Sequence, residues 1–444
     1  MKSDTIFAPS SGSGPAGIAI IRISGTEAGN LLDVLSGLKR PVPRVVKRAL
    51  IFDPKTGDAL DDGLVIWFPA PRSFTGEDVV ELHIHGGRAT IEAVCRSLSG
   101  FEGCRIAEPG EFSRRAFYNN KLDLTEIEGL ADLIAAETEG QRKQALKQLS
   151  GDLGGIYEAW REELLRLLAH AEAAIDFPDE ELPDNLIGTT KHNILGMTEK
   201  ITQYIDDKRQ GERMRDGLQV AIVGAPNVGK SSLLNYLTQR DVAIVSEQEG
   251  TTRDIIEVRL DLAGFPVTVA DTAGMRQTSQ AIEAEGVRRA KNRALTADFS
   301  IIVFEAGSLE KNSEIIEMAG PNDLVIINKS DLIGSPTIPP EFLRFSPIIV
   351  SVKTGFQLDV FLKTLTKRVD AIFSNTGPAP LTRLRHREAL GSCLDALNGA
   401  IEAPEAELMA EDLRLAAREL GRITGRVDVE DVLDVIFGEF CIGK

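Results

Sequence analysis

Hydrophobic and polar residues alternate differently in three zones of the chain. Up to about residue 118, short runs rich in β-branched residues are separated by segments with helical periodicity and punctuated by glycine and proline. This pattern predicts strands and helices in turn, at Gly17–Ser24, Asn30–Leu38, Gly63–Phe68, Asp78–His85 and Ala89–Leu98. We therefore expect a compact α+β domain over residues 1–118.

From Lys121 onward, apolar residues recur at every third or fourth position, as on one face of a helix. Helical stretches are predicted over Leu122–Leu149 and Leu153–Ile175, and the acidic, proline-containing stretch Asp176–Pro183 should end the second. A further helix is expected from about Asn185 to Arg213. The same periodicity returns later in the chain, at Arg383–Glu402, Glu405–Leu420 and Asp428–Phe437. Residues 119–214 and 376–444 are thus predicted to form two parts of one discontinuous helical domain, packed against each other.

Between these two parts, five short apolar runs alternate with helical patterns. The runs are Gln219–Val223, Val267–Ala270, Ile301–Phe304, Leu324–Ile327 and Ile348–Val352. Buried strands that alternate with helices are typical of a doubly wound, mostly parallel sheet. The sequence therefore predicts a multidomain α/β protein in which residues 215–375 form an α/β domain inserted into the helical domain.

The composition narrows the classes of function. The chain has 444 residues, of which 43% are hydrophobic and 26% charged, as in folded globular proteins, and it holds no apolar run long enough to span a membrane. The 67 acidic residues outnumber the 50 basic ones, so the net charge of −17 disfavours broad contact with nucleic-acid phosphates unless a partner supplies positive charge. Four cysteines without a CxxC pair, and a first segment without a signal pattern, indicate a cytoplasmic protein.

The strongest chemical signal is Gly224–Ser231 (GAPNVGKS), which fits the phosphate-binding pattern GxxxxGK[ST] directly after a predicted strand. Its glycines let main-chain N–H groups turn towards phosphate oxygens. Lys230 is expected to reach the β- and γ-phosphates, and Ser231 to ligate Mg²⁺. The nucleotide contacts predicted for this loop are Asn227, Val228, Gly229, Lys230, Ser231 and Ser232.

Three further motifs follow at the ends of predicted strands. The first is Asp271, Thr272, Ala273 and Gly274, in which Asp271 would hold the Mg²⁺ shell and the Gly274 amide would sense the γ-phosphate. The second contains Asn328, Lys329 and Asp331, and the third is Ser351, Val352 and Lys353, which would back the base. A carboxylate at Asp331 can accept both the ring N–H and the amino group of guanine, a donor pair that adenine lacks. The motifs predict GTP binding at the edge where doubly wound sheets hold their ligands.

Two features bear on hydrolysis of the nucleotide. The segment Gly250–Asp254 (GTTRD) fits a switch loop in which the Thr252 hydroxyl completes the Mg²⁺ shell. Met275 stands where Ras-like switches carry a water-orienting glutamine, so another polar group must position the water. Glu283 is a candidate, although a solvated helix face is the commoner role for such a residue. The amide oxygen of Asn227 could also ligate a monovalent cation beside the phosphates.

Together with shorter signatures outside the inserted domain, these motifs resemble the MnmE (TrmE) family of tRNA-modification GTPases. The signatures are Asp4–Ile6, Ile21–Gly25, Phe74–Asp78, His85–Gly87, Pro109–Phe112, Lys121–Leu124 and Cys441–Lys444. The resemblance implies a homodimer formed through the N-terminal domain, which binds a tetrahydrofolate derivative (5-formyl- or methylene-tetrahydrofolate). It implies a heterotetramer with the FAD- and NADH-dependent partner MnmG. This complex adds an aminomethyl or carboxymethylaminomethyl group to C5 of the wobble uridine of certain tRNAs.

The resemblance also implies residue roles. Potassium-dependent pairing of the GTPase domains would activate hydrolysis, with Glu283 as the catalytic glutamate. The folate contacts would be Arg22, Glu81, Lys121 and Lys444. The Mg²⁺ ligands would be Ser231 and Thr252, and the potassium ligands Asn227, Ser246, Gln248 and Thr251. The potassium loop also contains Glu247, Glu249 and Gly250, and it is more acidic than the family pattern.

Some roles stay open at this point. Cys441 fits either a nucleophile towards the uridine ring or one-carbon unit, or a packed structural cysteine. Glu81, His83 and His85 alternate on one predicted strand and so share a face, but no third partner for a metal is evident in the sequence. A regulatory or ribosome-assembly GTPase switch would carry similar nucleotide motifs. Such switches usually have a basic RNA-binding module, which the sequence does not show.

Overall fold

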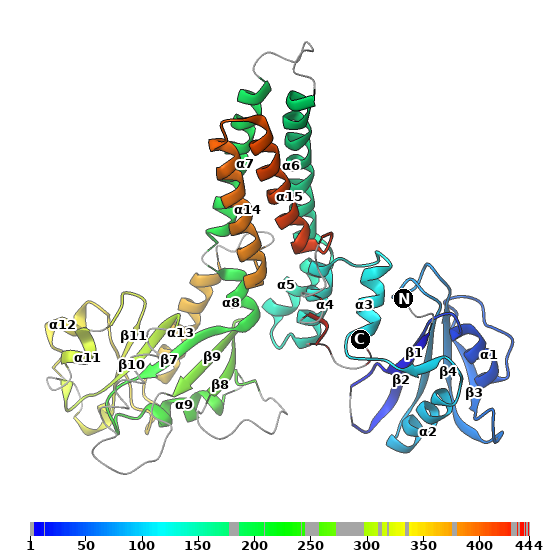
Figure 1. Ribbon diagram of the computed structural model, residues 1–444. Coiled ribbons are helices and arrows are strands. Elements are labelled where there is room, and N and C mark those ends of the chain that lie inside the picture. The colour runs from blue at the N-terminus through cyan, green and yellow to red at the C-terminus, as the bar shows by residue number, and fades with distance from the viewer. Residues whose placement is uncertain are drawn as a thin grey trace, which may run out of the picture. The chain divides into compact units, whose positions relative to one another are not determined.

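The computed structural model describes residues 4–12, 14–176, 186–207, 209–240, 242–244, 257–271, 297–309, 313–317, 319–333, 337–374, 380–427, 433, 436–438, 440 and 443. Contacts divide the chain into two compact units: residues 1–131, 149–169 and 410–444 form the first, and residues 132–148 and 170–409 form the second. Figure 1 labels the helices and strands of both units. None of the described helices combines the length and apolar content needed to cross a bilayer.

A six-stranded sheet forms the centre of the first unit. Its spatial order is β3–β4–β5–β2–β1–β6, in which β6 pairs parallel with β1 and the other neighbours are antiparallel. The strands are β1 (Thr5–Pro9), β2 (Ala16–Ser24), β3 (Lys47–Phe52), β4 (Ala59–Phe68), β5 (Val79–Gly86) and β6 (Cys104–Ile106). The predicted α+β class of this region is confirmed. The short strands β1, β3 and β6 are additions to the prediction.

Helices α1 (Ala28–Ser36) and α2 (Arg88–Ser99) cover one face of this sheet. Successive strand residues point to opposite faces, so one set of alternating side chains is buried under the two helices. This core contains Ile21, Ile23, Ile51, Val65, Trp67, Val80 and Leu82 from the sheet and Leu31, Leu32, Leu35, Val94 and Leu98 from the helices. The opposite face carries Arg22 and Glu81, and also Leu50 and Leu64, which are 42% and 40% exposed.

A network of five charged residues joins the start of β1 to β6 and to helix α3 (Glu111–Tyr118). Arg115 contacts Asp4, Glu77 and Glu111 at 3.1, 3.1 and 3.0 Å, and Arg105 contacts Asp4 at 2.6 Å. Burial by itself raises the pKa of the Asp4 and Glu111 carboxyls. Hydrogen bonds and charge from the two arginines outweigh burial and hold both pKa values below their ordinary range. The carboxylates are therefore ionised and paired in the folded protein at neutral pH.

The end of the chain returns to the first unit. Leu124 and Ile127 of α4 (Leu124–Ala135) are buried with Ile436 and Phe437. Gly443 lies beside the end of β1, where its carbonyl oxygen accepts a 2.7 Å hydrogen bond from Ser10 Oγ. Most of helix α6 (Asp152–Asp176) and of helix α15 (Ala406–Thr424) also belongs to this unit.

The helical part of the second unit contains α5 (Glu139–Leu149), α7 (Leu186–Ile205), α8 (Gln210–Asp216) and α14 (Leu384–Glu402). Helices α7 and α14, which precede and follow the inserted domain, pack side by side, as predicted. The helical stretch expected over Leu122–Leu149 is divided into α4 and α5. Thr138 Oγ1 accepts the Gln141 N–H at 3.3 Å, and Gln141 Oε1 accepts the Thr138 N–H at 3.0 Å, so this pair caps the start of α5.

The single helix expected from about Asn185 to Arg213 is wrong, because the chain breaks between α7 and α8. Arg209 there has a left-handed φ of 58°. Arg387 of α14 reaches into the break and contacts Asp207 at 2.8 Å and Glu212 at 3.0 Å, and it also donates to the Ile205 carbonyl. The buried Glu212 carboxylate has a lowered pKa because hydrogen bonds from Arg387 and Arg209 outweigh the effect of burial.

A second six-stranded sheet, in the order β12–β11–β10–β7–β9–β8, forms the core of the inserted domain. Its strands are β7 (Leu218–Val223), β8 (Glu257–Leu262), β9 (Phe265–Asp271), β10 (Phe299–Glu305), β11 (Leu324–Asn328) and β12 (Ile348–Ile349). All neighbours are parallel except the edge strand β8, which confirms the doubly wound, mostly parallel prediction. The prediction missed β8, and β12 ends earlier than Val352.

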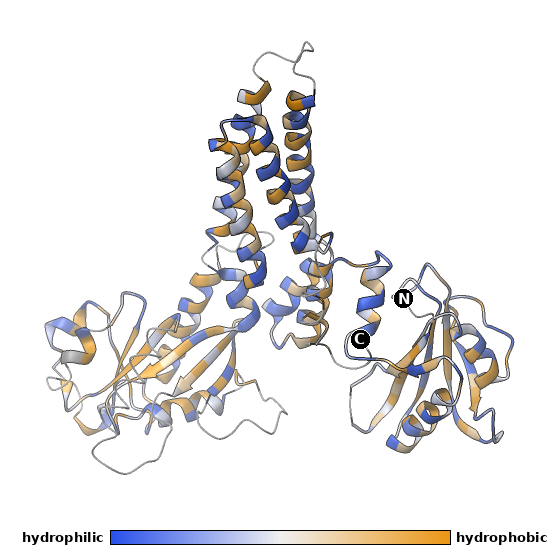
Figure 2. Cartoon of the chain, viewed as in Figure 1, coloured by the Kyte–Doolittle hydropathy of each residue, from blue (hydrophilic) through white to orange (hydrophobic). Residues whose placement is uncertain are grey.

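Helices cover both faces of this second sheet. Leu233 and Leu237 of α9 (Lys230–Thr238) and Phe361 and Leu365 of α13 (Leu358–Phe373) pack on one face. Ile316 of α11 (Ser313–Glu317) and Phe342 of α12 (Pro340–Leu343) pack on the other. Figure 2 shows that hydrophobic residues are concentrated in the strands between these layers.

The turn of the β8–β9 hairpin contacts α5. The Gly140 N–H donates to the Gly264 carbonyl at 2.8 Å, and Arg259 of β8 pairs with Glu137 at 3.2 Å. Two α5 side chains also bind the main chain of α8, since Gln141 donates to the Arg215 carbonyl at 2.9 Å and Gln144 to the Gly211 carbonyl at 3.1 Å. Helix α5 is thereby fixed to the inserted domain at two places.

The charge network around Arg115 should stabilise the first unit. Arg115→Met leaves Glu77 and Glu111 without a buried cationic partner, so we expect the free energy of unfolding to fall by about 3 kcal/mol in urea denaturation at neutral pH. Arg48→Met is the matched control. Its ion pair with Asp62 leaves the arginine side chain 79% exposed, so its loss should leave the free energy of unfolding unchanged within the error of the measurement.

The pH dependence of this effect has a defined sign. The folded-state pKa values of Asp4 and Glu111 are lowered from ordinary values of 3.8 and 4.5, so their contribution is present above those values and is lost as the pH falls through the lowered ones. The difference between the wild-type protein and Arg115→Met should therefore shrink on acidification below the ordinary values. A difference that grows there would contradict this account.

Candidate functional site

The phosphate-binding loop connects β7 to α9 at the C-terminal edge of the second sheet. Three of its residues have backbone conformations that a side chain disfavours: φ is 156° at Gly224, 63° at Asn227 and 104° at Gly229. These angles fold the loop back over the start of α9. A Cβ at Gly224 would collide with the Val303 carbonyl of β10, and one at Gly229 with the Asn328 amide nitrogen. The two glycines are therefore required by close approach as well as by φ.

Lys230 places its ammonium group inside the loop. Its Nζ donates to the carbonyl oxygens of Gly224 and Ala225 at 2.9 and 2.8 Å, and the residue is only 5% exposed. Lys230 thus holds a positive charge at the N-terminus of α9, inside a loop whose backbone turns around it. Such a site suits the terminal phosphates of a nucleotide. Asn227, Ser231 and Ser232 are exposed at the same end of α9. The role of Ser231 as a Mg²⁺ ligand stays a prediction.

Asn328, at the end of β11, connects two loops of the site. Its Nδ2 donates to the Val228 carbonyl of the phosphate loop at 2.8 Å, and its Oδ1 accepts the Val352 N–H at 3.1 Å. Because Asn328 is 3% exposed, both bonds are shielded from water. One side chain therefore fixes the spacing between the phosphate loop and the predicted base loop.

The predicted base-binding residues lie next to this bridge. Ser351 Oγ donates to Asp331 Oδ1 at 2.7 Å and also accepts the Thr354 N–H at 3.2 Å, which orients the Asp331 carboxylate. Lys329 has a left-handed φ of 64°, and its ammonium contacts Glu305 Oε1 at 3.2 Å. The oriented carboxylate of Asp331 suits the hydrogen-bonding edge of a guanine ring. The aliphatic part of Lys329, whose ammonium is fixed by Glu305, suits the face of the ring.

The structure brings most of the predicted nucleotide contacts to one sheet edge. Asn227–Ser232, Asn328–Asp331 and Ser351–Lys353 all follow the C-terminal ends of parallel strands, at and beside the β7–β10 switch point. Only the backbone of Asp271, at the end of β9, is described. Ser246, Glu247, Gln248, Glu249, Gly250, Thr251, Thr252, Thr272, Ala273, Gly274 and Glu283 lie outside the described residues.

A second predicted site lies on the exposed face of the N-terminal sheet. Arg22 and Glu81 are cross-strand neighbours on β2 and β5, and Arg22 Nη2 contacts Glu81 Oε1 at 2.9 Å. The guanidinium of Arg22 also lies 5.1 Å from the Phe74 ring centroid and 5.7 Å from that of Phe112. Both side chains remain partly accessible, at 20% and 18%. Phe112 is fully buried, so Phe74 is the partly accessible ring beside this charged pair.

Of the two other predicted folate contacts, Lys121 binds elsewhere, because its Nζ donates to the Pro71 carbonyl at 2.9 Å. Lys444 lies outside the described residues, as does Cys441. On β5, His83 contacts Glu81 at 3.5 Å, whereas His85 pairs with Asp61 at 2.8 Å. No group of three potential metal-ligating side chains occurs in the described part of the chain, so Glu81, His83 and His85 do not form a metal site there.

Sequence reasoning missed three residues that help to build these sites. Glu305 holds Lys329, and Phe74 and Phe112 lie against Arg22. Phe74 and Phe112 stand in the quoted signatures Phe74–Asp78 and Pro109–Phe112, so their positions were visible but their contact with Arg22 was not. Glu305 ends the strand before the Asn328 motif, and its register partner is Asn328 itself. In the sequence, the sign of this role was the place of Glu305 at the end of a strand that pairs with the strand before the Asn328 motif.

The chain matches known proteins over almost its whole length. The N-terminal part matches the family model described as GTP-binding protein TrmE N-terminus at residues 5–121, and residues 124–441 match the MnmE helical domain. A protein of Parvibaculum lavamentivorans named tRNA modification GTPase MnmE is 54% identical over 99% of this chain and 100% of its own length. Proteins of the same name from Rhodospirillum rubrum and Paramagnetospirillum magneticum are 51% and 52% identical over 100% of each chain.

The close contact at Gly229 generates a prediction. Gly229→Ala places a Cβ against the Asn328 amide in a left-handed conformation, so we expect the affinity for GDP to fall at least about 30-fold. A fluorescent GDP analogue can report the dissociation constant. Gly196→Ala on α7, where a Cβ meets open space, should leave the affinity unchanged. Equal affinity in Gly229→Ala and the wild-type protein would show that the loop does not need this contact.

Proposed function

Since the chain belongs to the MnmE family of tRNA modification GTPases, and is thus a GTPase that acts in tRNA modification, we propose that GTP hydrolysis by its inserted domain drives wobble-uridine modification. With the partner MnmG, which carries FAD and uses NADH, it adds an aminomethyl or carboxymethylaminomethyl group to C5 of the uridine. A tetrahydrofolate derivative supplies the one-carbon unit. The protein works in the cytoplasm.

The observation that carries this proposal is the joined nucleotide site. Asn328 fixes the phosphate loop to the base loop, Lys230 holds positive charge where the terminal phosphates lie, and Ser351 orients Asp331 for the guanine edge. These parts bind and position GTP. Mg²⁺ held by Ser231 and Thr252 would neutralise charge on the β- and γ-phosphates. Glu283 would position the attacking water in place of the glutamine of Ras-like switches.

Potassium enters the proposal through Asn227. This residue is exposed in the phosphate loop with a left-handed φ of 63°, which presents its side chain at the nucleotide face. A monovalent cation bound by its amide oxygen, and by Ser246, Gln248 and Thr251, would place positive charge beside the phosphates. There it supplies the charge that an arginine finger provides in other GTPases. Pairing of two such domains would complete this site and activate hydrolysis.

The exposed face of the N-terminal sheet supports the folate and homodimer parts of the proposal. Arg22 and Glu81 share this face with the exposed Leu50 and Leu64. A second copy of the chain can cover the apolar part and enclose the charged pair. In a partly enclosed site, Glu81 can accept hydrogen bonds from the pterin ring, and Arg22 can stack on it or donate to its carbonyl group. Lys121, Lys444 and Cys441 remain proposed contributors.

Hydrolysis should depend on potassium. Steady-state GTP turnover should be at least about tenfold faster in K⁺ than in Na⁺, because the proposed site supplies positive charge beside the phosphates only when it holds its cation. Asn227→Ala should abolish this difference, and Glu283→Ala should lower turnover in both salts while leaving GTP affinity intact. Asn193→Ala, on the exposed part of α7, is the control. Equal wild-type rates in both salts would refute the potassium site.

The purified protein should retain labelled 5-formyl-tetrahydrofolate, and Arg22→Ala or Glu81→Ala should weaken retention about tenfold or more, because each removes a charge-assisted contact. In cells that lack the wild-type protein, these variants should restore less wobble-uridine modification while GTP turnover stays normal. Arg88→Ala, whose ion pair with Glu92 is exposed on α2, is the control. No retention by the wild-type protein, or retention unchanged in both variants, would instead favour a regulatory or ribosome-assembly GTPase switch without modification chemistry.

A further inference from the structure

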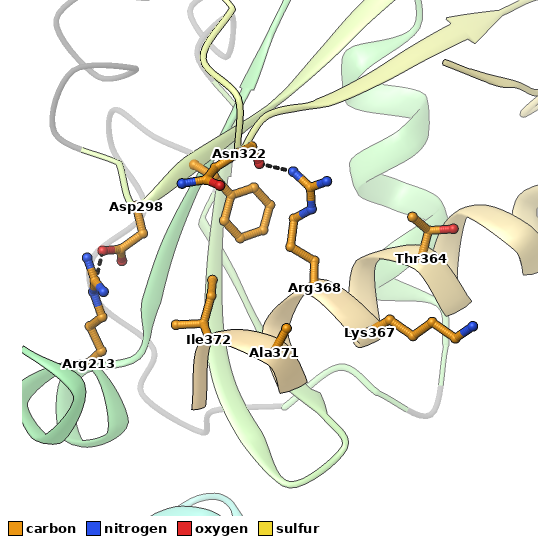
Figure 3. Close-up of a pocket in the computed structure, with 9 residues that line it drawn as sticks. Arg213, Asp298, Asn322, Thr364, Lys367, Arg368, Ala371 and Ile372 are labelled. Atoms are coloured by element: carbon orange, nitrogen blue, oxygen red, sulfur yellow. Dashed lines mark hydrogen bonds and ion pairs between the residues drawn. The ribbon is translucent and has the colours of Figure 1, made fainter. Parts of the chain in front are cut away.

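The inserted domain has a second cavity, at the sheet edge opposite the nucleotide site. It has a volume of about 570 Å³. Its lining comes from α8, the start of β10, the turn before β11 and the C-terminal part of α13 (Figure 3). The charged residues of the lining are Arg213, Asp298, Lys367 and Arg368. Because β10 and β11 start here and end at the nucleotide site, this cavity is separate from the GTP-binding edge.

The single carboxylate of the cavity lining is already neutralised. Asp298 Oδ1 accepts from Arg213 Nε at 2.7 Å, and Oδ2 accepts the Gln219 N–H at 2.8 Å. The nearby Asp323 carboxylate accepts the N–H groups of Ser300 and Gly320 at 2.6 and 2.7 Å. Neither carboxylate forms an ion pair with Lys367 or Arg368 in the described part of the chain, and the lining holds three cationic side chains against the one carboxylate of Asp298. A cavity with surplus positive charge is notable in a chain with a net charge of −17.

Arg368 is held in an orientation that leaves one edge of its guanidinium for a ligand. Its Nη1 donates to the main-chain carbonyls of Asn322 and Asp323. Carbonyl acceptors fix the group but do not cancel its charge. Within the described residues, Nε and Nη2 have no hydrogen-bond acceptor, and these two donors form the planar fork that binds carboxylate or phosphate bidentately. Lys367 likewise makes no ion pair with any residue that the structure describes.

The remaining lining is apolar. Phe299 is 3% exposed, and Ala371 and Ile372 lie on α13 between Arg213 and Arg368 (Figure 3). Thr364, Lys367, Arg368 and Ala371 recur at helical spacing and so share the side of α13 that borders the cavity. Cavities that bind small molecules commonly have this volume and combine an apolar body with a few oriented polar groups.

We propose that this cavity binds a small organic anion, in which a carboxylate or phosphate group pairs with Arg368 and Lys367 and an apolar body packs against Phe299 and Ile372. The proposal does not rest on the function proposed above, because the cavity does not share residues with the nucleotide site. The ligand would connect α13 to α8, the helix that leads directly into β7 and the phosphate loop. The cavity is thus suited to a metabolite that acts on the protein from outside its GTP site.

The test uses the full-length protein saturated with GDP and Mg²⁺, so that phosphate compounds cannot occupy the GTP site. Binding of 3-phenylpropionate and of phenyl phosphate is measured by ligand-observed NMR titration, with 3-phenylpropanol as the uncharged control. At least one acid should bind, and the alcohol at least about tenfold more weakly, because it cannot form the charge-assisted pair. A preference for one acid identifies the carboxylate or the phosphate as the natural group.

Variants localise the binding. Lys367→Gln and Arg368→Gln should each weaken acid binding about fivefold or more, and Arg368→Lys should restore only part of it because the fork is lost. Lys363→Gln, an exposed α13 position outside the cavity, is the control. Lys367 is exposed, so its variant tests the site even if Arg368→Gln perturbs folding.

Three outcomes would overturn the proposal: no binding of either acid, equal binding of the alcohol, or binding unchanged in Lys367→Gln. A tetraglutamate peptide that binds more tightly than both acids would also overturn it, because the cavity would then be a docking site for an acidic protein segment. Retained GDP binding in every variant separates failure here from failure of the nucleotide site.

Discussion

The two hydrogen bonds of the Asn328 amide are the contact on which the nucleotide site depends. The phosphate loop and the base loop come from different strands, and neither is long enough to define its position relative to the other. One buried side chain donates to the Val228 carbonyl and accepts the Val352 N–H, so it sets their spacing. Gly229 must lack a side chain for this bridge to form. Asn328 thus joins the two loops of the nucleotide site at the C-terminal edge of the sheet.

The parts of the fold that were predictable are those governed by local pattern. Apolar runs followed by glycine-rich or polar motifs predicted β7 and β11 and the loops after them. Residues that are adjacent in the sequence determine both the burial of such a strand and the chemistry of the loop that follows it. The break between α7 and α8 was not predictable in this way. It depends on Arg387 binding Asp207 and Glu212, residues that lie far away in the chain. The antiparallel strand β8 was missed because the prediction for this domain rested on continuous apolar runs, whereas β8 alternates charged and apolar residues as a half-buried edge strand does.

For the sites, the sequence supplied the residue types but not their interactions. Arg22 and Glu81 were predicted together, and they do pair across β2 and β5, but the placement of two aromatic rings against Arg22 is a tertiary feature. Helix α5, outside the inserted domain, binds both the β8–β9 turn and α8. In the sequence, the hairpin lies between the two segments predicted as switches. The turn that joins the two strands of this hairpin is therefore in contact with a helix outside the nucleotide-binding domain.

The contact between Ser10 and Gly443 has a consequence for biosynthesis. The two residues are separated by 433 positions, yet they are hydrogen-bonded neighbours at the end of β1. A ribosome adds residues one after another, so the N-terminal sheet emerges long before the C-terminal segment that contacts β1 exists. The first unit can therefore reach its final form only after the inserted domain, which is encoded between its parts, has been made. The N-terminal sheet is thus synthesised first, but its contact with the C-terminal segment is made last.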